Sequence, residues 1–242
     1  MSPAVEQSAD TGNTVADRLR SLRTAVEDAV RAAGREPGAV RMLLATKTVE
    51  PARIIEAFAA GYRLIGENRV QELLAKRDDL SPHAHETHVI GHLQSNKVNQ
   101  IVGRIDCLQT LDSVELALRL QRRLEAMDLA LSVFVQVNVS GEVTKAGVPP
   151  QAVDELIAQV AGCDRLAIRG LMTIGLNSSD RTAVRAGYAT LRRLRDRLRE
   201  SGRPGTEQLA ELSMGMSGDF SDAIAEGATM IRIGSAVFGP RG

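Results

Sequence analysis

The chain has 242 residues, and its 30 basic and 30 acidic side chains cancel to a formal net charge of zero. Zero net charge, 2% aromatic residues and no Trp argue against nucleic-acid binding, because basic surfaces and base-stacking side chains are scarce. No stretch approaches the roughly 20 apolar residues of a membrane span, and the polar N-terminus does not resemble a signal peptide. The chain has two cysteines, Cys107 and Cys163, which we expect to be reduced thiols. We therefore expect a cytoplasmic monomer with neither nucleic-acid nor membrane partners.

Residues 1–13 predict a disordered tail, and residues 14–34 predict a helix from apolar residues at helical spacing. Apolar strands and amphipathic helices then alternate about eight times. The predicted strands cover residues 40–47, 63–68, 87–94, 105–111, 132–139, 166–175, 208–215 and 230–239. The predicted helices cover residues 51–61, 69–80, 95–103, 112–127 with Asp112 as the cap, 149–162, 180–200 and 217–227.

This alternation is typical of a parallel sheet, and eight units in a chain of this length match a TIM barrel. A doubly wound open sheet is the alternative, because strand order cannot be read from one sequence. We predict a single α/β domain over residues 14–242, a TIM (β/α)8 barrel with an extra N-terminal helix.

Alternation within two strands predicts which side chains enter the barrel. In residues 132–139 the valines share one face, and a partly polar set with Gln136 and Asn138 shares the other. We expect the valines to meet the outer helices and the polar set to face inward. In the last strand Arg232 and Gly234 share a face, so Arg232 is also predicted to point inward.

Active sites of TIM barrels lie at the carboxyl ends of the strands. Those ends carry Lys47, Asn68, His92 with Gln94, Asn138, Met172–Thr173, Met214–Ser217 and Gly234–Ser235. Lys47 shares a strand face with Leu43 and Ala45, which predicts an amine at the barrel mouth. Such a lysine either extends to solvent or is desolvated enough to form a Schiff base with an aldehyde.

Phosphate sites in this fold use the loops after strands 7 and 8 and a helix N-terminus. We predict that Ser217 and Gly218 open a helix after strand 7, and that Gly234–Ser235 lets an oxyanion approach the backbone after strand 8. Together with an inward Lys47, these loops indicate a phosphorylated aldehyde, for which pyridoxal 5′-phosphate (PLP) is the candidate.

Six stretches resemble, in order, the pyridoxal phosphate homeostasis protein family: LLATKTV, LIGENRVQELLAK, HVIGHLQSNK, GLMTI, LSMGMSGDF and IRIGSAVFG. The resemblance runs from about residue 40 to 239 and implies a barrel like the N-terminal domain of alanine racemase. It implies Lys47 as the Schiff-base lysine, Asn68 beside the cofactor and Arg232 facing the pyridine nitrogen. It also implies phosphate contacts from Ser217, Gly234 and Ser235.

The resemblance further implies a function in PLP (vitamin B6) homeostasis without catalytic turnover. The protein would hold PLP as a lysine aldimine, with apo PLP-dependent enzymes as recipients. A guanidinium beside the ring nitrogen opposes its protonation and weakens the ring as an electron sink. The alternative for Arg232 is an ion pair with a buried acid such as Asp106 or Glu67.

A PLP-dependent amino-acid racemase is the alternative function. Two-base racemisation needs a second acid/base group, which alanine racemases take from a tyrosine of a second domain. This chain has only Tyr62, before a strand, and Tyr188, on an outer helix stripe. The short chain and these tyrosine positions favour the carrier.

Two further clusters suggest other functions only weakly. The histidines at 83, 85, 88 and 92 match no usual metal-ligand spacing, so we predict no metal site and disfavour a metal hydrolase. The arginines of residues 180–200 surround an apolar stripe, and we expect them to form a solvated or interacting face.

Overall fold

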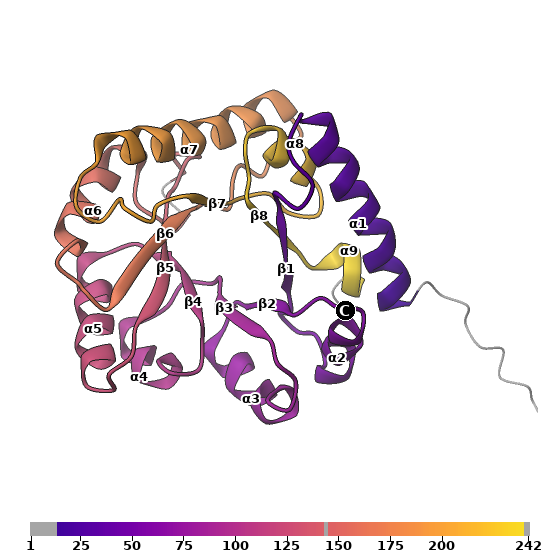
Figure 1. Cartoon of the computed structure of the whole chain (residues 1–242), viewed down its shortest axis with the longest axis horizontal. Helices are drawn as coiled ribbons and strands as arrows, with labels where there is room; N and C mark the ends of the chain where they lie inside the picture. Colours follow the sequence, from indigo (N-terminus) through magenta and orange to yellow (C-terminus); the bar gives the residue numbers. More distant parts are fainter. Residues whose placement is uncertain (1–13, 143–144, 240–242) are drawn as a thin grey trace, which may run out of the picture.

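The computed structural model describes residues 14–142 and 145–239, and the predicted tail over 1–13 lies outside them. Eight parallel strands follow one another around a closed barrel, in which β8 pairs with β1 (Figure 1). The TIM barrel prediction is therefore confirmed, and the open sheet is wrong. The strands are β1 (Arg41–Ala45), β2 (Leu64–Glu67), β3 (Glu86–Val89), β4 (Cys107–Leu111), β5 (Leu131–Gln136), β6 (Leu166–Met172), β7 (Glu211–Ser213) and β8 (Met230–Ile233).

Helices surround the ring of strands (Figure 1). They are α1 (Val15–Ala32), α2 (Pro51–Ala59), α3 (Val70–Leu80), α4 (Val98–Ile101), α5 (Val114–Glu125), α6 (Val153–Val160), α7 (Arg181–Ser201), α8 (Phe220–Ala225) and α9 (Ser235–Phe238). Two 3-10 turns, η1 (Ser95–Lys97) and η2 (Pro150–Ala152), precede α4 and α6.

The extra N-terminal helix α1 begins with a capping box, in which Thr14 and Asp17 each bind the other's backbone N–H. Its apolar stripe is buried, and the helix packs against α2, α8 and α9 (Figure 1). The first helix therefore closes the outer layer beside the last strand of the barrel.

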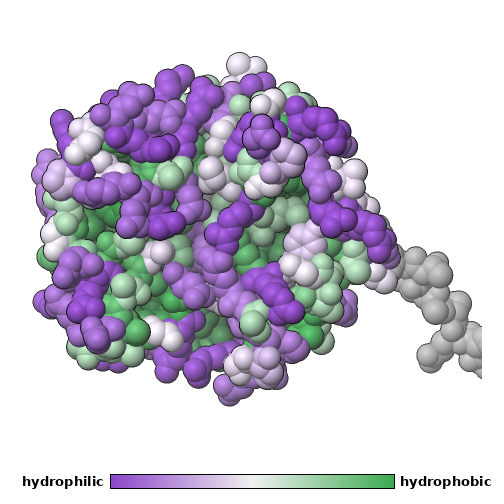
Figure 2. Space-filling view, in the orientation of Figure 1, coloured by the Kyte–Doolittle hydropathy of each residue, from purple (hydrophilic) through white to green (hydrophobic). Residues whose placement is uncertain are grey.

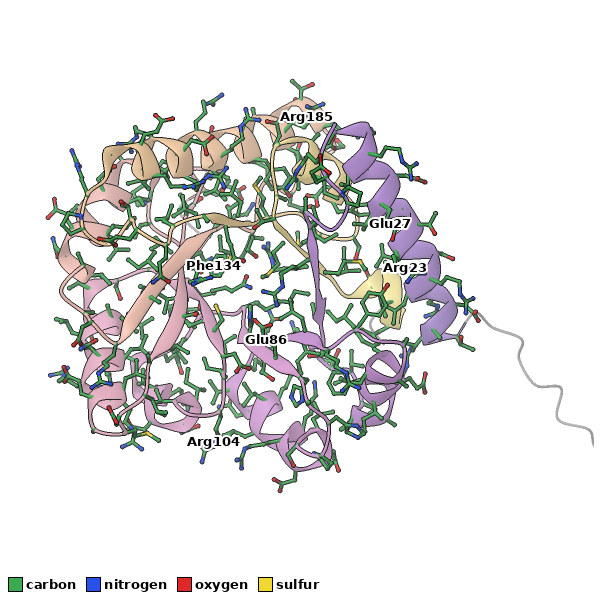
Figure 3. All side chains as sticks on the ribbon, viewed as in Figure 1. Arg23, Glu27, Glu86, Arg104, Phe134 and Arg185 are labelled. Atoms are coloured by element: carbon green, nitrogen blue, oxygen red, sulfur yellow. The ribbon has the colours of Figure 1, made fainter. Side chains whose placement is uncertain are left out.

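The barrel has an outer core between strands and helices and a smaller inner core. The valines at 133, 135 and 137 belong to the outer core, whereas Phe134 lies in the inner one (Figure 3). The inner core also contains Leu43, Leu64, Ile90, Cys107, Met172 and Met230. The predicted alternation of strand β5 is confirmed.

Several predicted strands and helices are longer than the observed ones, and three boundaries are wrong for a definite physical reason. Helix α5 is capped by Ser113, whose hydroxyl accepts the Leu116 N–H at 3.3 Å, while the Asp112 carboxylate lies 3.5 Å from His92. Helix α8 begins at Phe220, because the Asp219 carboxylate accepts the Met216 N–H at 2.6 Å and holds residues 217–219 in a turn. The last strand ends at Ile233, and residues 235–238 form the short helix α9.

The arginines of α7 are largely engaged with neighbouring helices. Arg181 forms a two-pronged contact with Asp222 of α8, Arg185 binds Glu226, and Arg197 binds Asp154 of α6. Figure 2 shows hydrophilic side chains over this helix, with apolar ones recessed between elements. Such ion pairs account for much of the arginine content without a nucleic-acid surface. None of the helices in the described ranges is long and apolar enough to cross a membrane.

Candidate functional site

A cavity of about 490 Å³ opens at the carboxyl ends of strands β1, β2, β7 and β8. All six predicted site residues line it: Lys47, Asn68, Ser217, Arg232, Gly234 and Ser235. Of the other strand-end residues, Met216 also lines it. His92 and Gln94 line a separate hollow, and the Asn138 amide donates to the carbonyls of Glu142 and Lys145.

Lys47 lies in a tight turn directly after β1. The Val49 N–H donates to the Thr46 carbonyl at 3.0 Å, and Thr48 adopts a φ of 60°. A β-branched residue rarely adopts this left-handed conformation, so the turn is strained and must be held by its surroundings. The Glu72 carboxylate of α3 does so by accepting the Thr48 N–H at 2.8 Å. The half-buried lysine is thereby held at the cavity wall.

A buried ion pair supports the other side of this turn. Lys76 of α3 donates to the Thr46 carbonyl at 2.6 Å and to the Glu67 carboxylate at 2.9 Å, and the Thr46 hydroxyl donates to the same Glu67 oxygen at 2.6 Å. Burial raises the pKa of Glu67, and the bonds from Lys76 and Thr46 oppose that rise. Both flanks of Lys47 are therefore anchored to charged groups of β2 and α3.

Arg232 forms the floor of the cavity and is only 6% exposed. Its guanidinium donates to Ser213 Oγ at 2.9 Å and to the Thr173 carbonyl at 2.7 Å. The alternative prediction, an ion pair of Arg232 with Asp106 or Glu67, is wrong. Glu67 binds Lys76, and Asp106 accepts the Thr87 N–H. Burial lowers the pKa of Arg232 to about 10, against the opposing influence of Tyr188 and Asp219. The guanidinium is therefore charged at neutral pH.

The loops after the neighbouring strands β7 and β8 both line the cavity. Gly234 immediately precedes α9, and a Cβ there would lie 3.2 Å from the Ala45 carbonyl oxygen. Within residues 14–142 and 145–239, the N–H groups of Ser235 and Ala236 have no backbone acceptor. TIM barrels bind phosphate with these two loops and the start of a short extra helix. The extra helix therefore follows β8, whereas the sequence suggested a helix start after β7.

Asn68, the first residue after β2, is held by a close backbone approach. A Cβ built on Gly91 would lie 2.1 Å from the Asn68 carbonyl oxygen, so only glycine fits at position 91. Gly91 thereby fixes the backbone from which the Asn68 side chain reaches the cavity.

Replacing Gly91 by alanine should consequently move the Asn68 backbone and destabilise the fold. We expect a loss of about 1–3 kcal/mol, typical of overpacking, and a fall in Tm of about 2–10 °C by thermal unfolding. Gly162→Ala is the matched control, because its Cβ would have no heavy atom within 4 Å. Equal Tm values for the two variants would contradict the packing role of Gly91.

Several residues that line the cavity were not predicted from the sequence. Arg53 lies in the first turn of α2, and its guanidinium is 5.8 Å from the ring centre of Phe238, another lining residue. Ile90 and Ile174 add apolar wall. A basic residue in the first turn of the helix after β1 was the available signal for Arg53, because that turn lies at the carboxyl end of the barrel.

The histidines are dispersed. His85 stacks on Phe58, His88 is buried inside the barrel, and His92 lies at the rim by Asp112. No group of three His, Cys, Asp or Glu side chains that could hold a metal ion comes together in the part of the chain that the structure describes.

Comparison with known proteins agrees with this geometry. Residues 19–242 match the family described as alanine racemase, N-terminal domain, which defines the class of barrel. A pyridoxal phosphate homeostasis protein of Aquifex aeolicus is 40% identical, covering 93% of this chain and 97% of its own. One of Pseudomonas aeruginosa is 39% identical, covering 95% and 96%.

A solved structure is also similar. PipY of Synechococcus elongatus, determined with PLP bound, is 34% identical, with a TM-score of 0.82, covering 93% of this chain and 100% of that one. The fold and site thus define a barrel of the alanine racemase N-terminal class. Within that class, the chain belongs to the pyridoxal phosphate homeostasis protein family.

Proposed function

We propose that this chain binds PLP in the 490 Å³ cavity and takes part in PLP homeostasis without catalytic turnover. The proposal rests on one observation: an amine, a buried guanidinium and the two loops with which TIM barrels bind phosphate all line one cavity. These groups come from strands far apart in sequence, and a phosphorylated aldehyde uses all of them.

The donor set of the cavity fits PLP. Lys47 supplies a primary amine. The Arg232 guanidinium donates to two protein oxygens, and its remaining N–H groups can donate to the ligand. Ser217, Ser235 and the backbone beside Gly234 supply neutral donors for a phosphate. Bound PLP supplies an aldehyde that reacts with amines and a ring that withdraws electrons.

The chain's own residues limit what that ring does. A charged Arg232 next to the ring nitrogen opposes protonation of that nitrogen. The unprotonated ring withdraws electron density less strongly. The Lys47 amine is the group in this cavity suited to bind the aldehyde and to exchange a proton with a substrate. Asn68 orients the ligand from the β2 side.

The positions of the tyrosines support a carrier in place of a racemase. Tyr188 is fully buried, and its hydroxyl donates to Asp219 at 2.6 Å. Burial, and then this hydrogen bond, raise the pKa of Tyr188. Tyr62 lines a groove with residues of α1. Neither lines the PLP cavity, so the described residues offer no tyrosine as a second base opposite Lys47.

Two measurements test this function. Purified protein given PLP should show a visible absorbance band, and incubation with L-alanine for hours should leave the alanine in the L form apart from slow exchange by Lys47. Chiral chromatography measures the latter. Absence of the band would contradict PLP binding, and racemisation at about 1 per second or faster would make the protein a racemase.

Ser235→Ala should weaken PLP binding about tenfold or more, because a hydrogen bond to a charged group is worth about 1.5–3 kcal/mol. Unphosphorylated pyridoxal should bind both proteins almost equally. Titration of each protein with each ligand measures the effect. Equal losses for the two ligands would count against a phosphate contact.

The open mouth of the cavity suits delivery of PLP to apo PLP-dependent enzymes, which we propose as recipients. Ser235 is exposed and Lys47 is only half-buried, so another protein can reach the ligand. We place this function in the cytoplasm because both cysteines are free and buried, which suits a reducing compartment. The expected monomeric state stays a prediction from the sequence.

A further inference from the structure

The floor of the cavity continues into the barrel as a chain of hydrogen bonds. Ser213 Oγ accepts from Arg232 at 2.9 Å and donates to Gln109 Oε1 at 2.6 Å. Ser213 and Gln109 are fully buried, so no water competes for these bonds. These hydrogen bonds thus link β8 to β7 and then cross the barrel to β4.

The same chain reaches the opposite end of the barrel. Gln109 Nε2 lies 2.7 Å from His88 Nδ1, and His88 Nε2 lies 2.7 Å from Glu86 Oε1 at the start of β3. Glu86 lies within the ring of strands and also pairs with Arg41 (Figure 3). The hydrogen bond from His88, and then the Arg41 guanidinium, lower the pKa of Glu86, against the effect of its partial burial. The hydrogen-bond chain therefore ends on a negatively charged carboxylate, that of Glu86.

The chemistry of the donors gives every link one direction. A guanidinium only donates, so Ser213 Oγ accepts from it, and the hydroxyl donates its proton to Gln109 Oε1, the oxygen that faces it at 2.6 Å. The Gln109 amide then faces His88 with its N–H, and its nitrogen also lies 3.0 Å from the sulfur of Met230. His88 Nδ1 must accept, which leaves the proton on Nε2 to be donated to Glu86.

We propose that Ser213, Gln109 and His88 are positioning residues for Arg232, held in one orientation by a hydrogen-bond chain that ends on Glu86. Arg232 touches the ligand, and the other three act through it. The proposal rests on the proposed function only in assuming that Arg232 faces bound PLP. Removing one link leaves its buried neighbours unpaired and lets the guanidinium turn.

The first test uses the cofactor-free protein and does not depend on PLP binding. Nitrogen NMR of His88 should show a neutral ring with the proton on Nε2. Gln109→Glu should place a proton on both nitrogens at pH 7, because a carboxylate accepts from Nδ1 while Glu86 accepts from Nε2. A proton on Nδ1 of His88 in the wild-type protein would contradict the proposed direction of the hydrogen bonds.

The second test measures the Kd for PLP. Ser213→Ala and Gln109→Leu should each raise it about three- to tenfold, as expected for one lost hydrogen bond. Gln109→Glu keeps the oxygen that accepts from Ser213 and should stay within about twofold of wild type. Cys107→Ala, a change in the same inner core outside the chain, is the matched control for lost packing.

These outcomes separate the two proposals. Failure of the wild-type protein to bind PLP would contradict the proposed function, while the His88 spectrum would still report on the chain. PLP binding with an unchanged Kd in both Ser213→Ala and Gln109→Leu would overturn the positioning role. Circular dichroism verifies that each variant is folded. If Gln109→Leu does not fold, an unchanged Kd in Ser213→Ala alone overturns the positioning role.

Discussion

Lys47→Ala should abolish the visible absorbance band of the PLP-loaded protein and weaken PLP binding about tenfold or more. The reason is chemical: in the proposed function the Lys47 amine at the cavity wall binds the aldehyde, and alanine would leave only the phosphate and ring contacts. Absorbance titration with PLP measures both effects.

Lys97→Ala is the matched control for this change. Lys97 lies in η1 and does not line the cavity, so its loss should leave the band and the affinity unchanged. Retention of the full band in Lys47→Ala would show that another amine binds the aldehyde.

Lys76→Met should destabilise the fold by about 3–5 kcal/mol at pH 7, because it leaves the buried Glu67 carboxylate without its charged partner. One Glu67 oxygen already has no hydrogen-bond partner in the described structure, so little compensation is available. Denaturant unfolding at pH 7 measures the free energy of unfolding.

The pH dependence of this loss has a definite sign. A buried carboxylate with a raised pKa favours folding in its protonated form, so the variant should gain stability as pH falls from about 8 towards 5. The double variant Lys76→Met/Glu67→Leu removes both charges and should regain much of the stability. A loss in Lys76→Met that does not change with pH would contradict the unpaired-carboxylate explanation.

Much of the fold could be predicted because hydrophobic periodicity fixes the order of strands and helices. The alternation in β5 and β8 also predicted that Phe134 and Arg232 enter the barrel, and they do. The boundaries near Ser113, Phe220 and Ile233 could not be predicted, because single side-chain hydrogen bonds and glycine turns decide them.

The site was predictable to the extent that strand ends converge. Lys47 could be placed at the mouth of the barrel from its position at a strand end, and Arg232 inside the barrel from the alternation of its strand. The supports of Lys47 could not, because Glu72 and Lys76 lie on α3 and meet the turn only through tertiary packing. The chain from Arg232 to Glu86 joins four strands and left no local pattern in the sequence.

We propose that Lys47 holds PLP in this cavity. Borohydride treatment of PLP-loaded protein followed by peptide mass mapping tests it most directly, because reduction fixes the ligand on the amine that binds it. We expect the pyridoxyl group on the peptide that contains Lys47, at close to one per chain. A pyridoxyl group on Lys76, Lys97 or Lys145, or on no peptide at all, would contradict the account.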